Sequence, residues 1–384
     1  MKSLSLVLAV ALAGSLAIAA APAEAQIKVG YTLSATGPAA ALGGPQKNAV
    51  ALLPSEIAGQ KVEYIVLDDA TDGTKAVANA RKMITEDKID VLMGSSVAPT
   101  SFPLIDIAAE NKVPLIVITA SAATVVPVDD KKRWAFKVVQ HDSLMAQAVV
   151  EHMKKAGVKT VGFIGFNDAY GDGWYTEFEK LATPAGIKIV AREAYARADT
   201  SVTGQTLKLI AANPQVILIA ASGTPAVLPQ KALKERGYKG QIYQTHGIST
   251  PAFIQLGGKD VEGTIFPAGP IVMADQLDDA NPIKAPALDF IKRYTEMYGQ
   301  PPAAFAAHSL DATRLLAAAI PEALKKAKPG TPEFRVALRD ALEGAKDVVL
   351  LHGIANMSPS DHNGFDERAR VMVVIKDGKW QLLK

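Results

Sequence analysis

The chain has 384 residues, of which 41 are Lys or Arg and 39 are Asp or Glu, so its formal net charge is +2. The basic residues are scattered and form no stripe, which argues against a nucleic-acid partner. There is no cysteine, so the fold has neither a disulfide nor a thiol that accepts a lipid, and core burial alone must stabilise it. Chains of this length usually divide into two domains, each with its own core.

The N-terminus has the pattern of a secretory signal peptide. Lys2 precedes an almost entirely apolar stretch at residues 4–20, and Ala23-Glu24-Ala25 supplies the small-x-small cleavage pattern. A membrane anchor is the alternative, but no basic stop-transfer cluster follows the apolar stretch. We therefore expect residues 1–25 to be removed, the mature chain to begin near Gln26, and the protein to reside in the periplasm.

Short apolar runs then alternate with helical patterns. The first runs are "IKVGYTL" (27–33), "VEYIVLDD" (62–69), "IDVLMG" (89–94) and "VPLIVIT" (113–119). They are continuously apolar rather than alternating, as expected of strands in a parallel sheet that helices cover on both faces. This series predicts a first α/β lobe.

A second series of similar length follows, with strand patterns at "TVGFIGF" (160–166), "VILIAAS" (216–222) and "QIYQTH" (241–246). The stretch "QHDS" (140–143) lies between the two series and carries no apolar run, so we expect it to be a hinge. The sequence therefore predicts two doubly wound parallel-sheet lobes.

The regular alternation of strand and helix patterns ends towards the C-terminus. Residues 266–282 are rich in Pro, Asp and Gly, which predicts a second crossing between the lobes followed by a loop. Three helical stretches come next. The final segment "ARVMVVIKDGKWQLLK" predicts a hairpin with Asp377-Gly378 as its turn.

Two donor-rich, uncharged loops follow neighbouring strands of the first lobe, at "GSSVAPTS" (94–101) and "TASAAT" (119–124). In open α/β sheets, ligands bind beyond the carboxyl ends of the strands, where helix N–H groups and hydroxyls favour an anion. The two loops predict a carboxylate site without a basic side chain. The alternative is that these Ser and Thr residues only cap helices.

The corresponding loops of the second lobe offer different chemistry. Tyr170 and Trp174 lie at the start of a predicted helix, "ASGTPA" (221–226) is small and polar, and "QTHGIS" contributes His246. An aromatic face opposite a donor-rich face suits a small amphipathic anion held between two lobes.

Catalytic motifs are missing from the sequence. There is no Gly-x-Ser-x-Gly, no phosphate-binding Gly-x4-Gly-Lys and no His-Glu-x-x-His. The histidines do not have zinc-ligand spacing; they are His141, His152, His246, His308, His352 and His362. We therefore expect a binding protein that is not an enzyme and uses no cofactor or metal.

The chain resembles the type I periplasmic solute-binding proteins of ABC importers, in the branched-chain amino-acid (Leu/Ile/Val) group. The resemblance covers essentially the whole mature chain and rests on the order and spacing of several stretches. These are "IKVGYTLSATGPAAALGG", "DDATDGTKAVANARKMI", "NKVPLIVITASAAT", "FNDAYGDG", "VILIAASGTPA", "AAHSLDATRLLAAAI" and "NGFD".

This resemblance implies a non-catalytic receptor with two discontinuous lobes, which are joined by three crossings and close on the ligand by a hinge motion. It implies a first lobe of residues 26–141 and 268–350 and a second lobe of residues 142–267 and 351–384. The expected partners are a small-molecule carboxylate and the permease subunits of an importer, and we expect a monomer.

The resemblance also assigns residues. The ligand carboxylate is expected at Ser95, Ser96, Ala120, Ser121 and Ala122, and Tyr170 matches the family's ligand-stacking tyrosine. The complete set of expected ligand-binding residues is Leu42, Ser95, Ser96, Thr100, Ala120, Ser121, Ala122, Tyr170, Ser222, His246 and Gly247.

Two positions depart from the family pattern. His246 stands where amino-acid-binding members usually carry Glu or Asp to pair the ligand ammonium, and Leu42 stands where an aromatic residue is frequent. Burying an unpaired ammonium costs several kcal/mol. We therefore predict a carboxylic acid without an α-amino group, either aromatic or a 2-oxo acid. His246 either donates to a keto or hydroxyl oxygen or only caps its loop.

Three other hypotheses remain open from the sequence. One is an ordinary amino-acid receptor in which Asp168 or Asp199 supplies the acidic group. Another is a sensor domain that signals through a separate partner. The last is a hydrolase, for which the sequence contains no motif.

Overall fold

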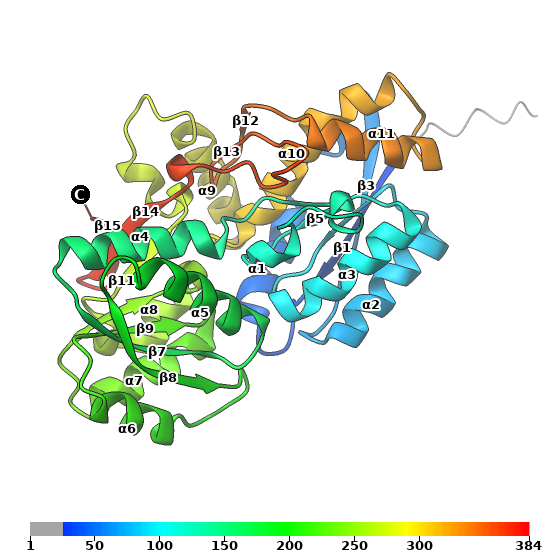
Figure 1. Cartoon of the computed structure of the whole chain (residues 1–384). Helices are drawn as coiled ribbons and strands as arrows, with labels where there is room; N and C mark the ends of the chain where they lie inside the picture. The colour runs from blue at the N-terminus through cyan, green and yellow to red at the C-terminus, as the bar shows by residue number, and fades with distance from the viewer. Residues whose placement is uncertain (1–25, 384) are drawn as a thin grey trace, which may run out of the picture.

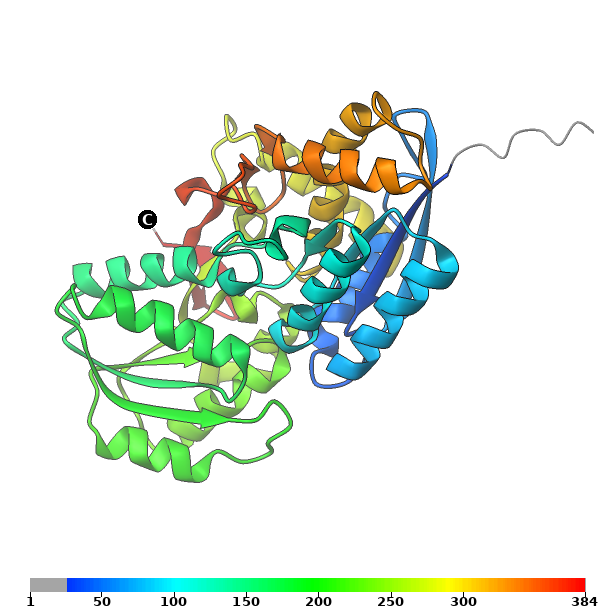
Figure 2. The ribbon, with the colours of Figure 1, turned by 45° about the vertical axis from the view of Figure 1, so that its right-hand side comes forward.

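The computed structural model describes residues 26–383, so the predicted signal peptide at residues 1–25 lies outside the described residues. The chain forms two α/β lobes, which confirms the predicted fold class (Figure 1). The rotated view in Figure 2 separates the lobe built around the blue N-terminal strands from the green lobe of the middle of the chain. Within residues 26–383, no helix has the length and apolar character needed to cross a membrane.

The first sheet is parallel except for its edge strand β2, with β1 between β3 and β4. In spatial order its strands are β2 (Glu56–Ile57), β3 (Gln60–Asp68), β1 (Ile27–Leu33), β4 (Val91–Gly94), β5 (Leu115–Val117) and β6 (Ala135–Lys137).

The second sheet is parallel over five strands and ends in an antiparallel hairpin. In spatial order its strands are β15 (Lys379–Leu382), β14 (Val371–Lys376), β11 (Ile265–Ala268), β10 (Gln241–Gln244), β9 (Val216–Ala220), β7 (Thr160–Phe166) and β8 (Lys188–Tyr195). The predicted hairpin is confirmed, and both Asp377 and Gly378 have positive φ, as a tight two-residue turn requires.

Helices cover both faces of each sheet, as Figure 1 shows. The first lobe contains α1 (Ala40–Val50), α2 (Gly73–Lys82), α3 (Ala98–Asn111), α9 (Lys284–Tyr298), α10 (Ala306–Leu324) and α11 (Pro332–Glu343). The second lobe contains α4 (Asp142–Lys155), α5 (Ala169–Ala182), α6 (Thr203–Ala211), α7 (Val227–Glu235) and α8 (Pro251–Gly257). A short antiparallel pair joins β12 (Val348–Val349) to β13 (Ile354–Ala355).

Burial on both faces explains why the strands have continuous apolar sequences. Tyr31 of β1 is fully buried, and its hydroxyl donates to the Ser309 carbonyl of α10 at 3.2 Å. Its neighbour Gly30 points to the opposite face, where an added Cβ would meet Met83 and Ile89 at less than 3 Å. Each residue of β1 therefore packs against one helical layer or the other.

The chain passes between the two sheets three times: at Gln140, at Gly269, and in a third segment that includes His352 and Ala369. These three passages meet at one point. The Gln140 side-chain amide, on the first passage, donates to the carbonyl oxygens of His352 at 3.0 Å and Ala369 at 2.9 Å, both on the third. The second passage lies against them at Gly269, where a Cβ would meet Gln140 and His352 at 2.6 and 2.5 Å. The predicted hinge stretch thus contributes Gln140 to this meeting point. The helical segment η7 (Pro270–Gln276) occupies part of the stretch predicted as a loop.

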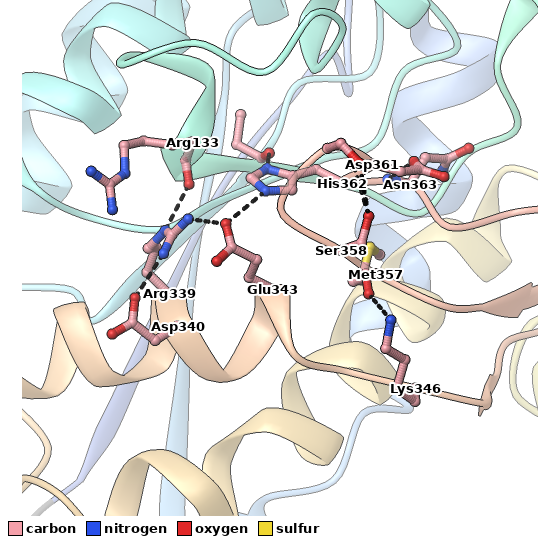
Figure 3. Close-up of polar contacts among 12 residues, drawn as sticks. Arg133, Arg339, Asp340, Glu343, Lys346, Met357, Ser358, Asp361, His362 and Asn363 are labelled. Carbon is pink, nitrogen blue, oxygen red and sulfur yellow. Dashed lines mark hydrogen bonds and ion pairs between the residues drawn. The ribbon is translucent and has the colours of Figure 1, made fainter.

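The third passage is held against the first lobe before it reaches the second sheet at β14. Asn363 donates to the carbonyl oxygens of Lys137 and Val139, and His362 contacts the Ala135 carbonyl at 2.8 Å through Nδ1. On its other side, His362 lies 3.2 Å from Glu343 of α11, which also pairs with the buried Arg339 (Figure 3). The predicted lobe boundary at residue 351 therefore falls inside the β12–β13 hairpin, and residues 362–363 still pack against β6 of the first lobe.

Candidate ligand-binding site

A cavity with about 350 Å³ of empty space, which includes space open to solvent, lies between the lobes, at the carboxyl ends of strands from both sheets. Its lining residues are Leu42, Ser96, Val97, Ile118, Thr119, Ala120, Val139, Tyr170, Ser222, His246, Gly247, Phe305 and His308. Seven of the residues expected from the sequence are among them: Leu42, Ser96, Ala120, Tyr170, Ser222, His246 and Gly247.

Ser96 lines the cavity directly before helix α3. Its hydroxyl donates to the Gln46 side-chain carbonyl at 2.6 Å and accepts from the Ser34 amide at 3.0 Å. Gln46 lies 3.5 Å from His308 Nδ1. These contacts fix the position of Ser96 at the helix N-terminus, where the helix dipole favours a negative ligand group.

Ser95 and Thr100 lie beneath this wall rather than in it. Both are fully buried, and the Ser95 hydroxyl donates to Asp69 at 2.6 Å while it accepts from the Thr100 hydroxyl at 2.7 Å. Asp69 also accepts from the Ser34 hydroxyl at 2.7 Å. The structure therefore places the Ser95 and Thr100 hydroxyls in a supporting network, with Ser96 between them and the cavity.

The start of the second donor-rich loop, Thr119 and Ala120, forms the floor of the cavity together with the preceding Ile118. The expected residues Ser121 and Ala122 do not line the cavity. The Ala122 amide donates to the Asp142 carboxylate at 3.1 Å, so it is already engaged.

Tyr170, Ser222 and Gly247 form much of the second-lobe wall. Tyr170 lies in the first turn of α5, whose N-cap Asp168 accepts from the Tyr170 and Gly171 amides. The buried Tyr170 hydroxyl lies 2.8 Å from the Thr245 hydroxyl, which fixes the ring against the cavity. Burial raises the pKa of Tyr170 above its ordinary value.

His246 is 6% exposed and lies in the second-lobe wall, with its ring centroid 5.8 Å from that of Trp174. Burial, helped by electrostatic interaction with Lys137, lowers the pKa of His246 to about 3. The ring is therefore neutral at physiological pH. Its Nδ1 atom is buried without a hydrogen-bond partner among the described residues. A buried polar atom of this kind is costly unless a ligand or water satisfies it.

The structure adds residues that the sequence analysis did not assign to the site. His308 and Phe305 come from the start of α10, far along the chain from the other lining residues. Phe305 packs in one apolar cluster with Leu42 and Val97. It thus supplies an aromatic side chain beside the position where Leu42 replaces the frequent aromatic residue. The sequence signal was "AAHSLDATRLL", which carried the family resemblance but gave no direction for its side chains.

The two lobes touch each other around the cavity. Gly223 of the second lobe has a φ of +64°, and an added Cβ would lie 2.9 Å from the Leu42 side chain of the first lobe. The two lobes are therefore in direct contact beside the cavity.

No carboxylate lines the cavity. Asp168, considered from the sequence as a partner for an ammonium, pairs with Arg197 at 2.6 Å and caps α5. Asp199 is exposed and accepts from the Ala196 amide at 2.8 Å. Among residues 26–383, no group of three or more histidine and carboxylate side chains is placed to hold a metal ion.

Comparison with known proteins agrees with this geometry. The sequence profile of the periplasmic binding protein family matches residues 26–379. An extracellular ligand-binding receptor from Rhodopseudomonas palustris HaA2 is 51% identical and superimposes with a TM-score of 0.91, covering 94% of this chain and 100% of its own. The Leu/Ile/Val-binding protein homolog 3 of Brucella melitensis is 27% identical over 272 residues, which are 69% of this chain and 73% of that protein.

The fold is also shared with a branched-chain amino acid transporter substrate binding protein from Streptococcus pneumoniae in complex with isoleucine. That protein is 20% identical, with a TM-score of 0.76 and coverage of 94% of this chain and 99% of its own.

Proposed function

Because the chain belongs to the periplasmic binding protein family, we propose that it is the receptor of an ABC importer and captures a small carboxylate without an α-amino group. The ligand is an aromatic or 2-oxo acid, held between the two lobes and delivered to the permease subunits in the membrane. The receptor acts in the periplasm, as a monomer, by binding without turnover.

The composition of the cavity wall carries this proposal. An α-amino acid brings an ammonium group that needs a buried anion or several acceptors. The position expected to provide the anion holds the neutral His246, and the nearby carboxylates of Asp168 and Asp199 are outside the lining. The N-terminus of α3 with Ser96 favours the carboxylate, and His246 Nδ1 is available for a keto or hydroxyl oxygen.

The remaining wall supports an apolar ligand body. Leu42, Val97 and Phe305 form a single apolar cluster on the first-lobe side, and the Tyr170 ring faces the cavity from the second lobe. A planar ring or a short branched chain buries its surface between these groups, with its polar end towards Ser96.

A thermal-shift screen of the mature protein tests the proposal. Benzoate, phenylpyruvate and 4-methyl-2-oxopentanoate are compared with L-phenylalanine and L-leucine. A ligand at a hundred times its Kd stabilises the folded state by about 2.7 kcal/mol, enough to raise the melting temperature by a few degrees. Shifts confined to the acids support the proposal. Equal or larger shifts with the amino acids contradict it and favour a branched-chain or aromatic amino-acid receptor, the alternative that the names of the relatives suggest.

The variant His246→Glu sharpens this test. It places a carboxylate at the position that lacks one, so we expect weaker binding of the acids and stronger binding of the matching amino acids. Gln255→Glu, at an exposed position of α8 in the same lobe, adds the same charge outside the cavity lining and serves as the control.

A further inference from the structure

A buried lysine lies directly beneath the floor of the cavity. Lys137 is the last residue of β6 and has no exposed surface. Its Nζ atom donates to the carbonyl oxygen of Ala120, and it lies 2.9 Å from Nδ1 of His141. Since Ala120 itself lines the cavity, the lysine nitrogen contacts a residue of the cavity wall.

The charges around Lys137 leave it without a direct counter-ion. Within the described part of the chain, no carboxylate approaches Nζ closely enough to form an ion pair; the carboxylates that act on it are Asp142 of α4 and Asp361 of the third passage. Asp142 directs Oδ1 to the amides of Ala122 and Ser143. The other titratable groups that face Lys137 are the imidazoles of His141, His246 and His308.

The Ala120 carbonyl is fully used by this arrangement. It accepts from Lys137 Nζ and also from the Asp142 amide, at 3.3 Å. A carbonyl oxygen has two lone pairs, so neither remains for a ligand donor. A ligand ammonium above Ala120 would find no free acceptor in this carbonyl and would be repelled by the charged form of the lysine behind it.

We propose that Lys137 is a specificity-determining residue, whose buried ammonium attracts the carboxylate of an organic acid and excludes ligands that carry an ammonium group. This inference rests on the proposed function and identifies the residue that determines which ligand charge the receptor accepts. Lys137 is not among the lining residues; it acts through the electrostatic potential of the floor and by occupying the carbonyl oxygen of Ala120.

Proton uptake gives this role a signature that a purely structural lysine would not have. Burial lowers the pKa of Lys137 to about 7, so the free receptor holds its proton only partly above neutral pH. A carboxylate bound above the floor favours the charged form and raises that pKa. Burial holds the pKa values of His141 and His308 well below their usual range and that of His246 at about 3, so these rings stay neutral. Binding of an acid near pH 8 should therefore take up a proton at Lys137.

The experiment is isothermal titration of the full mature protein and of Lys137→Met with three matched pairs of probes. These are phenylpyruvate with L-phenylalanine, 4-methyl-2-oxopentanoate with L-leucine, and benzoate with benzamide. In Lys137→Met we expect the affinity for the acids to fall about tenfold or more, that for the two amino acids to stay the same or rise, and that for the neutral benzamide to change less than about threefold. Titrations at pH 8 in two buffers of different protonation enthalpy should show proton uptake in the wild type and none in the variant.

Two further variants complete the design. Lys137→Met with Asp142→Asn removes both buried charges and replaces the single variant if that one does not fold. Lys154→Met changes the net charge equally at the exposed far end of α4 and should leave every affinity unchanged. An unchanged acid-to-partner ratio with unchanged proton uptake overturns the role of Lys137 and leaves the proposed function standing. A wild-type protein that prefers the amino acids overturns both.

Discussion

The imidazole rings of His308 and His352 lie with their centroids 4.4 Å apart. His308 lines the ligand cavity, whereas His352 lies on the third passage between the lobes, where its carbonyl accepts from Gln140. His352 is held in place by Asp311, whose carboxylate lies 2.7 Å from its Nδ1. One pair of packed rings therefore connects the ligand site to the point where the three passages meet. Both rings are anchored to α10, which contains His308 and Asp311, so this helix links the cavity wall to the meeting point of the passages.

The meeting point of the passages should be intolerant of a single added methyl group. In Gly269→Ala the new Cβ would lie 2.5 Å from His352 and 2.6 Å from Gln140, so one passage must shift. We expect a loss of about 1–3 kcal/mol in the free energy of unfolding, measured by urea denaturation. The matched control is Gly204→Ala in the exposed first turn of α6, where an added Cβ meets nothing and should stabilise by up to about 1 kcal/mol. Equal effects at both positions would contradict a crowded hinge.

Asp69 should be essential to the first-lobe wall although it does not reach the cavity. Its carboxylate accepts from the hydroxyls of Ser34 and Ser95 and from the Thr71 amide, and it is fully buried. Asp69→Ala leaves these donors unpaired, and we expect a loss of about 3–5 kcal/mol in stability. Asp72→Ala removes an exposed helix N-cap three residues later and should cost about 1 kcal/mol. Chemical denaturation of both variants distinguishes a buried network from a surface cap.

The stability of the protein should depend on pH through Lys137. Its pKa is about 7 in the folded state and 10.5 in the unfolded state, so between these values the unfolded chain binds a proton that the folded one does not. Stability from this group therefore rises as the pH rises from about 7 to 10.5, and the cost below pH 7 is on the order of 5 kcal/mol. Lys137→Met lacks this cost, so its advantage over the wild type should be largest at pH 6.5 and shrink towards pH 10. Urea unfolding at three pH values measures it; a constant difference would show that burial does not perturb the lysine.

Tyr170 should contribute to binding through its ring rather than its hydroxyl. In Tyr170→Phe the Thr245 hydroxyl keeps its bond to the Ala221 carbonyl at 2.7 Å, so we expect less than about threefold loss of affinity. Tyr170→Ala removes the apolar face and should weaken ligand binding about tenfold or more. Tyr175→Ala on the same helix lies outside the cavity lining and is the control. Calorimetric titration with the acid found in the thermal-shift screen gives the three affinities; a large loss in Tyr170→Phe would instead assign a polar role to the hydroxyl.

Much of the fold was predictable because strands that are buried on both faces of a parallel sheet have continuously apolar sequences. The strands Ile27–Leu33 and Thr160–Phe166 begin and end where the apolar runs predicted. The predicted runs at residues 216–222 and 241–246 extend two residues beyond strands β9 and β10, because the chain leaves the sheet there to form the cavity wall.

The sequence by itself therefore determined the α/β lobes, the positions of the small polar loops at strand ends and the absence of a carboxylate at residue 246. Only the tertiary structure decided which side chains reach the ligand space. Ser95 and Ser96 are adjacent and chemically identical, yet one faces Asp69 and the other lines the cavity. Successive residues of an extended segment point in opposite directions, and packing of the whole lobe selects which direction is inward. Lys137 and His308 lie at the site only because strands and helices that are distant in the sequence pack around it. Local sequence patterns do not predict such contacts.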